Sequence, residues 1–378
     1  MLKNLIKSFI TATILLNLLP QAILANNDIL KVELLTTTQK KYICVNSDSI
    51  IKNSHMPLNK VDNWCIKSKK DFLSLYQNNN NNEHHLPKKI TITGNENNPV
   101  CISNSTIKKR CYKGDIEIST DTNNLNLINT VNMVDYLYST TGSELPHKWP
   151  EEAVKAQAIA IQSYTLNKIE HNKHIKDSTQ DIFYGGTLYE KPDYNKYIDK
   201  VKNIIMVDKN NKPIEALFHS TCAGGTLNND IVFKGKPEKY LRSVKCNYCS
   251  DSNFYKDHIV KIQKNKLLTD LHTNNLQIIH NDTGKIEKII IDNNTFTPYE
   301  FWLKLGHCLG WGTAPGIKYN ITLSNNLYQI TSKGAGHAVG LCQWGSRKMA
   351  TMGYKYTDIL RFYYKNILFF DINTKKQN

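Results

Sequence analysis

The sequence predicts an α+β protein with a mainly β N-terminal region, followed by a region that mixes helices and strands. Residues 29–34 alternate apolar and polar side chains, as a half-buried strand does, and short strand-like runs recur at 41–45, 89–93 and 116–119. From about Leu125 the pattern changes, because the apolar residues of 131–140 have helical spacing. A second helix begins at 150–153 with Pro and two carboxylates in its first turn.

This pattern predicts how the chain is organised. We expect a signal peptide at 1–25, the mainly β region at 26–124 and the mixed region at 125–378, with a β-rich insertion at 251–330. Within the mixed region, 204–207 and 214–218 are predicted to pair as strands, and 346–352 and 357–364 to form short helices. The Asn-rich run 77–83 is predicted as a loop.

The first residues predict export. Lys3 and Lys7 precede an apolar run at 9–19, and the segment closes on Ala25, which is the arrangement of a secretory signal. Because the apolar run is short for a membrane span, we expect cleavage after Ala25. The alternative is an uncleaved N-terminal anchor, which would be the only attachment to a membrane. Both place the rest of the chain outside the cytoplasmic membrane, in the periplasm or cell envelope.

The formal net charge of +15 indicates an anionic partner. The alternative is an AT-rich coding bias, since the positive charge is almost entirely Lys and Asn is abundant too. Because we find no DNA- or RNA-binding motif, the charge does not predict a nucleic-acid-binding protein.

Nine cysteines in an exported chain cannot all pair as disulfides. Cys246 and Cys249 form a C-x-x-C motif, and His219 and Cys222 form an H-x-x-C motif upstream. Two such half-sites can close one tetrahedral Zn²⁺ site, so we expect structural zinc, with the remaining six cysteines free to form three disulfides. The alternative is a disulfide among Cys222, Cys246 and Cys249 with no metal.

Two segments are candidates for chemistry. Glu144 lies in a Gly-Ser-Glu-Leu-Pro break between two helices, where apolar surroundings would raise its pKa and make it a general acid. The alternative is a solvated turn residue. The Gly-rich segment 334–345 carries His337, Gln343 and Trp344, side chains suited to contacting sugars, although a tight turn packed on the core would have the same composition.

Taken together, these motifs resemble the stage II sporulation protein D (SpoIID) family, with its amidase-enhancer relatives (LytB). The match runs in chain order through blocks at 112–118, 131–137, 143–158, 218–225, 240–244, 336–345 and 349–364. The block Ser143-Glu144-Leu145-Pro146 with Trp149-Pro150 reproduces the family signature almost position by position. Residues 26–105 and 255–330 match only loosely.

The resemblance implies a SpoIID-like catalytic domain at 125–378 that cleaves peptidoglycan glycan strands as a lytic transglycosylase. Glu144 corresponds to the family's catalytic Glu, which would protonate the glycosidic oxygen between N-acetylmuramic acid and N-acetylglucosamine. Its carboxylate would then take the proton of the muramic 6-hydroxyl as a 1,6-anhydro ring closes. Substrate contacts are expected from the residues of the matching blocks: Gln157, Tyr164, Ser220, Gly336, His337, Gln343 and Trp344.

Three positions depart from the family pattern. Gln162 stands where the family usually has Arg, Ala338 where it has Gly, and Leu341-Cys342 where it has Met-Ser. Cys342 is a candidate to pair with Cys308. These departures point to an altered substrate preference, or to a non-catalytic glycan-binding protein that enhances a cell-wall amidase. A third alternative is an exported zinc-stabilised scaffold with no catalysis.

Overall fold

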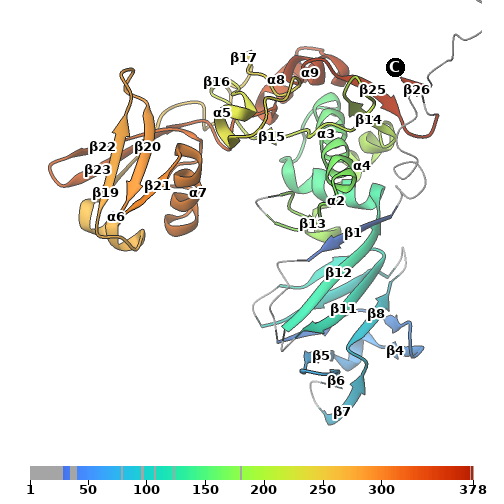
Figure 1. Ribbon diagram of the computed structural model, residues 1–378. Helices are drawn as coiled ribbons and strands as arrows, with labels where there is room; N and C mark the ends of the chain where they lie inside the picture. The colour runs from blue at the N-terminus through green and yellow to red at the C-terminus, as the bar shows by residue number, and fades with distance from the viewer. Residues whose placement is uncertain are drawn as a thin grey trace, which may run out of the picture.

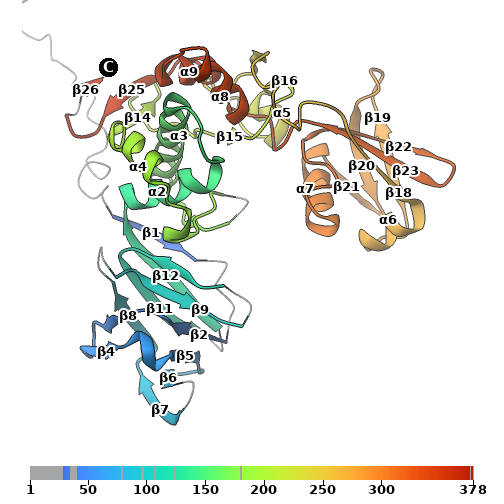
Figure 2. The same cartoon turned by 180° about the vertical axis from the view of Figure 1, so that it is seen from behind.

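The computed structural model describes residues 29–34, 41–77, 80–94, 98–105, 108–121, 124–178, 181–374 and 376–377. The predicted signal peptide at 1–25 lies outside these residues. Figures 1 and 2 show N-terminal strands at one end of the molecule, a helical region above them, and a smaller group of strands and helices projecting to one side. The α+β class is therefore confirmed. No helix of the described part of the chain combines the length and the apolar character that a bilayer crossing needs.

The N-terminal strands form two sheets, in the orders β13-β1-β12-β11-β8-β3-β4 and β10-β9-β2-β5-β6-β7. Their bounds are β1 (Ile29–Glu33), β2 (Tyr42–Val45), β3 (Ser49–Ile51), β4 (Met56–Leu58), β5 (Trp64–Ser68), β6 (Leu73–Gln77), β7 (Asn80–Leu86), β8 (Lys89–Thr93), β9 (Val100–Ser103), β10 (Arg110–Tyr112), β11 (Asp115–Asp121), β12 (Asn124–Asn132) and β13 (Ile175–Lys176). A short 3-10 turn at Lys60–Asp62 precedes β5. In β12 alternate residues are buried, as the period-two pattern predicts.

Two predicted boundaries in this region are wrong. The Asn-rich loop is shorter than expected, because β7 begins at Asn80 and pairs with β6 through its backbone, which its Asn-rich composition does not prevent. The helix predicted from 131 begins at Met133, since β12 continues to Asn132. The Asn132 side chain then caps that helix by accepting a hydrogen bond of 2.9 Å from the Asp135 amide.

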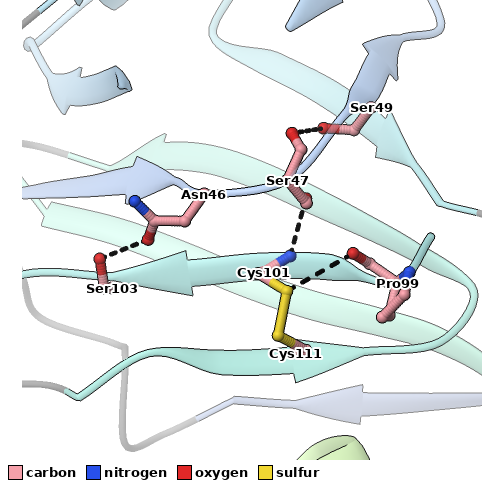
Figure 3. Close-up of a disulfide and its surroundings, with 7 residues drawn as sticks. All are labelled: Asn46, Ser47, Ser49, Pro99, Cys101, Ser103 and Cys111. Carbon is pink, nitrogen blue, oxygen red and sulfur yellow. Dashed lines mark hydrogen bonds between the residues drawn. A yellow bond between two sulfur atoms is a disulfide. The ribbon is translucent and has the colours of Figure 1, made fainter. Parts of the chain in front are cut away.

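Disulfides join neighbouring strands of the second sheet. Cys44 of β2 bonds to Cys65 of β5, and Cys101 of β9 to Cys111 of β10. Figure 3 shows the second of these bridges, where the Cys101 amide donates to Ser47 Oγ at 2.9 Å. The expectation of three disulfides is not met among the described residues, because Cys308 is exposed and free and Cys342 is buried elsewhere.

Helices form the middle of the molecule. They are α2 (Met133–Glu144), α3 (Glu151–Glu170), α4 (Pro192–Asp199), α5 (Asn229–Phe233), α8 (Gln343–Thr351) and α9 (Tyr356–Tyr363), with a 3-10 turn at Gly186–Tyr189. The Ala-rich α3 packs against α2, α4, α8 and α9, because small side chains let the other helices approach it closely. The helices predicted at 346–352 and 357–364 are confirmed within a few residues, as α8 and α9.

Short strands complete this region: β14 (Ile204–Val207), β15 (Phe218–His219), β16 (Gly224–Gly225), β17 (Lys245–Cys246), β24 (Leu341–Cys342), β25 (Leu368–Asp371) and β26 (Lys376–Gln377). The predicted pairing of 204–207 with 214–218 is confirmed only beside the turn, where the Ile214 amide donates to the Met206 carbonyl at 3.1 Å and Val207 bridges Pro213. Along its length β14 pairs with β25 near the C-terminus. The contact at the turn does not extend into a regular ladder, since Pro213 has no amide hydrogen to donate.

The projecting part, residues 258–333, is called here the side module. It consists of β18 (His258–Gln263), α6 (Lys264–Asp270), β19 (Leu276–His280), β20 (Ile286–Ile291), β21 (Asn294–Phe296), α7 (Pro298–Leu309), β22 (Lys318–Ser324) and β23 (Leu327–Lys333). Leu267, Phe301 and Ile330 belong to a core of its own, while Tyr299 packs against both this core and the main one. Thr297 and Glu300 form a capping box at the start of α7, which fixes that helix end.

Candidate active site

Glu144 is the last residue of α2, and the loop 183–191 fixes the end of that helix. Ser143 Oγ donates to the Phe183 carbonyl at 2.9 Å, and Lys191 Nζ donates to the Gly142 carbonyl at 2.7 Å. No other residue fits at position 142, because a Cβ there would lie 1.9 Å from the Tyr189 carbonyl oxygen. The loop and the helix end therefore hold Glu144 in one place.

Gln343, which is 199 positions further along the chain, contacts the Glu144 carboxyl. The parallel pairing of β24 with β15 places the start of α8 beside α2 and α3, and Gln343 Nε2 donates to Glu144 Oε2 at 3.1 Å. Burial raises the pKa of the Glu144 carboxyl, and the hydrogen bond from Gln343 opposes that shift without cancelling it. The end of a helix, where unpaired carbonyls gather, also disfavours the carboxylate. Glu144 is thus suited to donating a proton.

Glu144 lines a cavity of about 630 Å³. The structure brings six of the predicted catalytic and substrate-binding residues together in its wall: Glu144, Tyr164, Ser220, Gly336, His337 and Gln343. Gly336 permits this packing because the position admits no side chain. Its φ is +89°, and an added Cβ would lie 2.9 Å from the His219 Cβ. A second cavity of about 440 Å³, which Lys191 and His147 line, shares Glu144 with the first.

Two predicted substrate-binding residues lie outside the lining of the main cavity. Gln157 is buried within α3, and neither its Oε1 nor its Nε2 has a hydrogen-bond partner among the described residues. Trp344 packs edge-on against Trp149 with ring centroids 5.7 Å apart, while the Arg347 guanidinium lies over its ring. Packing between aromatic rings explains Trp344 without a substrate.

His219, predicted as a metal ligand, instead lines the cavity of Glu144. Its Nδ1 lies 3.1 Å from the Val339 carbonyl oxygen, so this nitrogen carries the hydrogen and Nε2 is a bare acceptor. The Val339 amide donates to His337 Nδ1 at the same distance of 3.1 Å. Burial lowers the pKa of His219 to about 3 and that of His337 to about 4, so both rings are neutral at physiological pH.

Four buried cysteines form a candidate metal centre beside the cavity. The Sγ atoms of Cys222, Cys246, Cys249 and Cys342 all lie within 4.8 Å of one another. Cys342 takes the place expected for His219, because β24 pairs with β15 and so brings a residue from 120 positions away to Cys222. Four mutually close thiols at this spacing fit the tetrahedral sulfur shell that Zn²⁺ prefers. Each is a free thiol rather than half of a disulfide.

The sequence did not reveal several residues of the cavity wall. They are Asp181, Ile182, Leu217, Phe218, Phe233, Tyr299, Trp302, Leu303, Trp311 and Pro315. Asp181 is a second carboxylate in the cavity, and it pairs with Lys168 and the Tyr164 hydroxyl. The concentration of aromatic residues at 299–311 was the one available signal for the part of the wall that comes from the side module.

Comparison with known proteins places this site in a family. The Stage II sporulation protein (SpoIID) family matches residues 121–207, which include Glu144 and α3. An uncharacterized protein of Brachyspira hyodysenteriae is 31% identical over 261 residues, 65% of this chain and 69% of the relative. Stage II sporulation protein D of Bacillus subtilis is 24% identical over 63% of this chain and 74% of its own length. The amidase enhancer of Bacillus subtilis is 22% identical over 59% of this chain and 38% of its own length.

The site places a half-buried Glu at the end of a helix, in the wall of a cavity in a mixed α+β fold. The chain belongs to the SpoIID family. Relatives with a descriptive name are called stage II sporulation protein D and amidase enhancer, names that connect them with sporulation and with an amidase.

Proposed function

We propose that this protein is an exported lytic transglycosylase that cleaves the β-1,4 bond between N-acetylmuramic acid and N-acetylglucosamine, with Glu144 as its general acid and base. The observation that carries the proposal is the half-buried Glu144 carboxyl, which has a raised pKa and lies in the wall of a large cavity. A carboxyl group with a raised pKa keeps its proton to higher pH than an ordinary Glu and can donate it to a glycosidic oxygen.

The reaction needs one residue in two protonation states. Neutral Glu144 gives its proton to the leaving oxygen as the glycosidic bond breaks, and its carboxylate then accepts the proton of the muramic 6-hydroxyl as that oxygen bonds to the anomeric carbon. Gln343 donates to Glu144 Oε2, so it stabilises the carboxylate in the second half of the cycle. No water enters the products.

The departures from the family pattern support catalysis rather than binding alone, because none of them lies in the cavity wall. Gln162 is buried and donates to the Lys202 carbonyl at 2.7 Å. Ala338 is buried and takes φ +59°, a conformation that Gly adopts more readily. Cys342 belongs to the cysteine cluster.

Zn²⁺ is proposed as a structural ion held by Cys222, Cys246, Cys249 and Cys342. Four thiolates would fill the tetrahedral shell, so the ion would have no open coordination position for a substrate and would supply cross-linking rather than chemistry. Lys318 of the side module donates to the Cys222 carbonyl at 2.8 Å and to the Gly225 carbonyl at 2.6 Å. The cluster would therefore also fix the attachment of the side module.

The similarity to an amidase enhancer supports a second candidate, a glycan-binding protein that stimulates a cell-wall amidase. The two functions differ in their dependence on Glu144. Purified glycan strands are incubated with the mature chain, with Glu144→Gln and with the exposed control Glu287→Gln, and the products are identified by mass spectrometry. Anhydro-muramic ends from the parent and the control alone support the enzyme. Retained binding to the strands with no products from any variant supports the enhancer.

A further inference from the structure

A continuous row of aromatic rings leads from the side module into the cavity of Glu144. Ring centroids are 5.1 Å apart for Trp311 and Trp302, 6.0 Å for Trp302 and Tyr299, and 5.0 Å for Tyr299 and Phe233. Phe233 in turn lies 5.4 Å from His337. Every member of this row lines the same cavity as Glu144. We call the part formed by Phe233, Tyr299, Trp302 and Trp311 the aromatic wall.

The wall is held in place from several directions. Trp302 is buried, and its indole nitrogen donates to the Ala314 carbonyl at 2.7 Å. Trp311 lies against Gly306 of α7, where an added Cβ would come within 2.4 Å of the indole ring. Trp311 nevertheless remains 38% exposed, so one part of its surface is free to meet a ligand.

The charge of the cavity restricts what can lie on this wall. Among the described residues that line it there is no Lys or Arg. Its carboxyl groups are Glu144 and Asp181. An anionic ligand would therefore find no cation here, whereas an uncharged sugar ring presents C–H groups that pack well on the electron-rich faces of aromatic rings.

We propose that the aromatic wall stacks sugar rings of the glycan strand and so holds the scissile bond at Glu144. The side module is then part of the substrate site. The inference rests on the proposed function for its substrate, and it assigns Trp311 and Tyr299 as determinants of binding. The binding energy gained when sugars stack away from the scissile bond helps to position that bond at Glu144. Loss of an aromatic ring of the wall should therefore weaken glycan binding.

The test uses Trp311→Ala and Tyr354→Ala in a chain that also carries Glu144→Gln, so that the glycan is not consumed. Tyr354 is a matched control, because it is 37% exposed, packs on another aromatic ring at 6.2 Å and does not line the cavity. Binding of purified glycan oligosaccharides, with and without stem peptides, is measured by calorimetry. Trp311→Ala should weaken binding of both by about tenfold or more, and Tyr354→Ala by less than about twofold.

Binding of Trp311→Ala within twofold of the parent would overturn the proposal. So would a loss confined to strands that carry stem peptides, because the wall would then hold peptide rather than sugar. Gly306→Ala, which displaces the Trp311 ring without removing it, should weaken binding in the same direction. Melting temperatures close to the parent value show that each variant is folded.

The outcome is separable from that of the proposed function. If Glu144→Gln cleaves glycan as well as the parent, the mechanism fails while a loss of binding in Trp311→Ala still supports the wall. If Glu144→Gln is inactive and Trp311→Ala binds normally, the mechanism stands and the wall is wrong.

Discussion

Gln343 donates a hydrogen bond of 3.1 Å to the carboxyl group of Glu144, although 199 positions separate the two residues in the chain. One residue ends α2 and the other begins α8, and α3 packs against both helices. The pair thus joins the matching blocks 143–158 and 336–345 through one hydrogen bond.

Replacing Gln343 by Leu should shift the pH dependence of cleavage. The hydrogen bond lowers the pKa of Glu144 against the effect of burial, so its removal raises that pKa further. Because the acid form begins the reaction, the alkaline limb of the kcat/KM profile should move to higher pH. Activity at the optimum should fall about three- to tenfold through lost orientation. Gln277→Leu, at an exposed position of β19, should leave the profile unchanged, and an unmoved limb in Gln343→Leu would contradict the role of the contact.

Glu144→Gln should stabilise the protein, with a gain that depends on pH. A carboxyl whose pKa is higher in the folded than in the unfolded chain destabilises the fold increasingly as pH rises through the folded pKa. The amide removes that cost, so the melting temperature should rise at pH 8 by about 2–4 °C for each kcal/mol gained. The difference should vanish below about pH 3, where the carboxyl is protonated in both the folded and the unfolded chain. A gain that is equal at both pH values would contradict a raised pKa.

Cys342→Ser should release the proposed zinc. The cluster needs four thiolates, so the loss of one lowers both the metal content and the free energy of unfolding by several kcal/mol. Metal content measured by plasma emission should drop well below one ion per chain, while Cys308→Ser, at an exposed free thiol, keeps it. Unchanged metal content in Cys342→Ser would show that Cys342 is not the fourth zinc ligand and that another residue fills that position.

Asp181→Asn tests whether the second carboxylate of the cavity takes part in chemistry. Asp181 is held by Lys168 and the Tyr164 hydroxyl, which suits a residue that positions the cavity wall. We expect kcat/KM to fall about three- to thirtyfold, against the roughly hundredfold or greater loss expected for a general acid. The products should remain anhydro-sugars. A loss as large as that of Glu144→Gln would make Asp181 a reacting group.

The fold was predictable where local signals decide it. The alternation in β12 and the Pro150 start of α3 are visible in the sequence, and both elements are present. The pairing of β14 with β25 was not, because their partner residues, such as Ile204 and Asp371, are far apart in the chain and share no local pattern.

The site divides in the same way. Glu144 and His337 are recognisable from the motifs around them, and both lie in the cavity. Cys342 could not be identified as the fourth member of the cysteine cluster, since only the parallel pairing of β15 and β24 brings it to Cys222. Trp302 and Trp311 belong to a segment with a core of its own, and its position beside the cavity is a tertiary property.

The central claim is that Glu144 forms an anhydro ring without water. The most direct measurement is mass spectrometry of the products that the parent chain releases from purified glycan strands in water enriched with oxygen-18. The account predicts anhydro-muramic ends that carry no label and disappear in Glu144→Gln. Reducing ends that carry one labelled oxygen would show hydrolysis and contradict it.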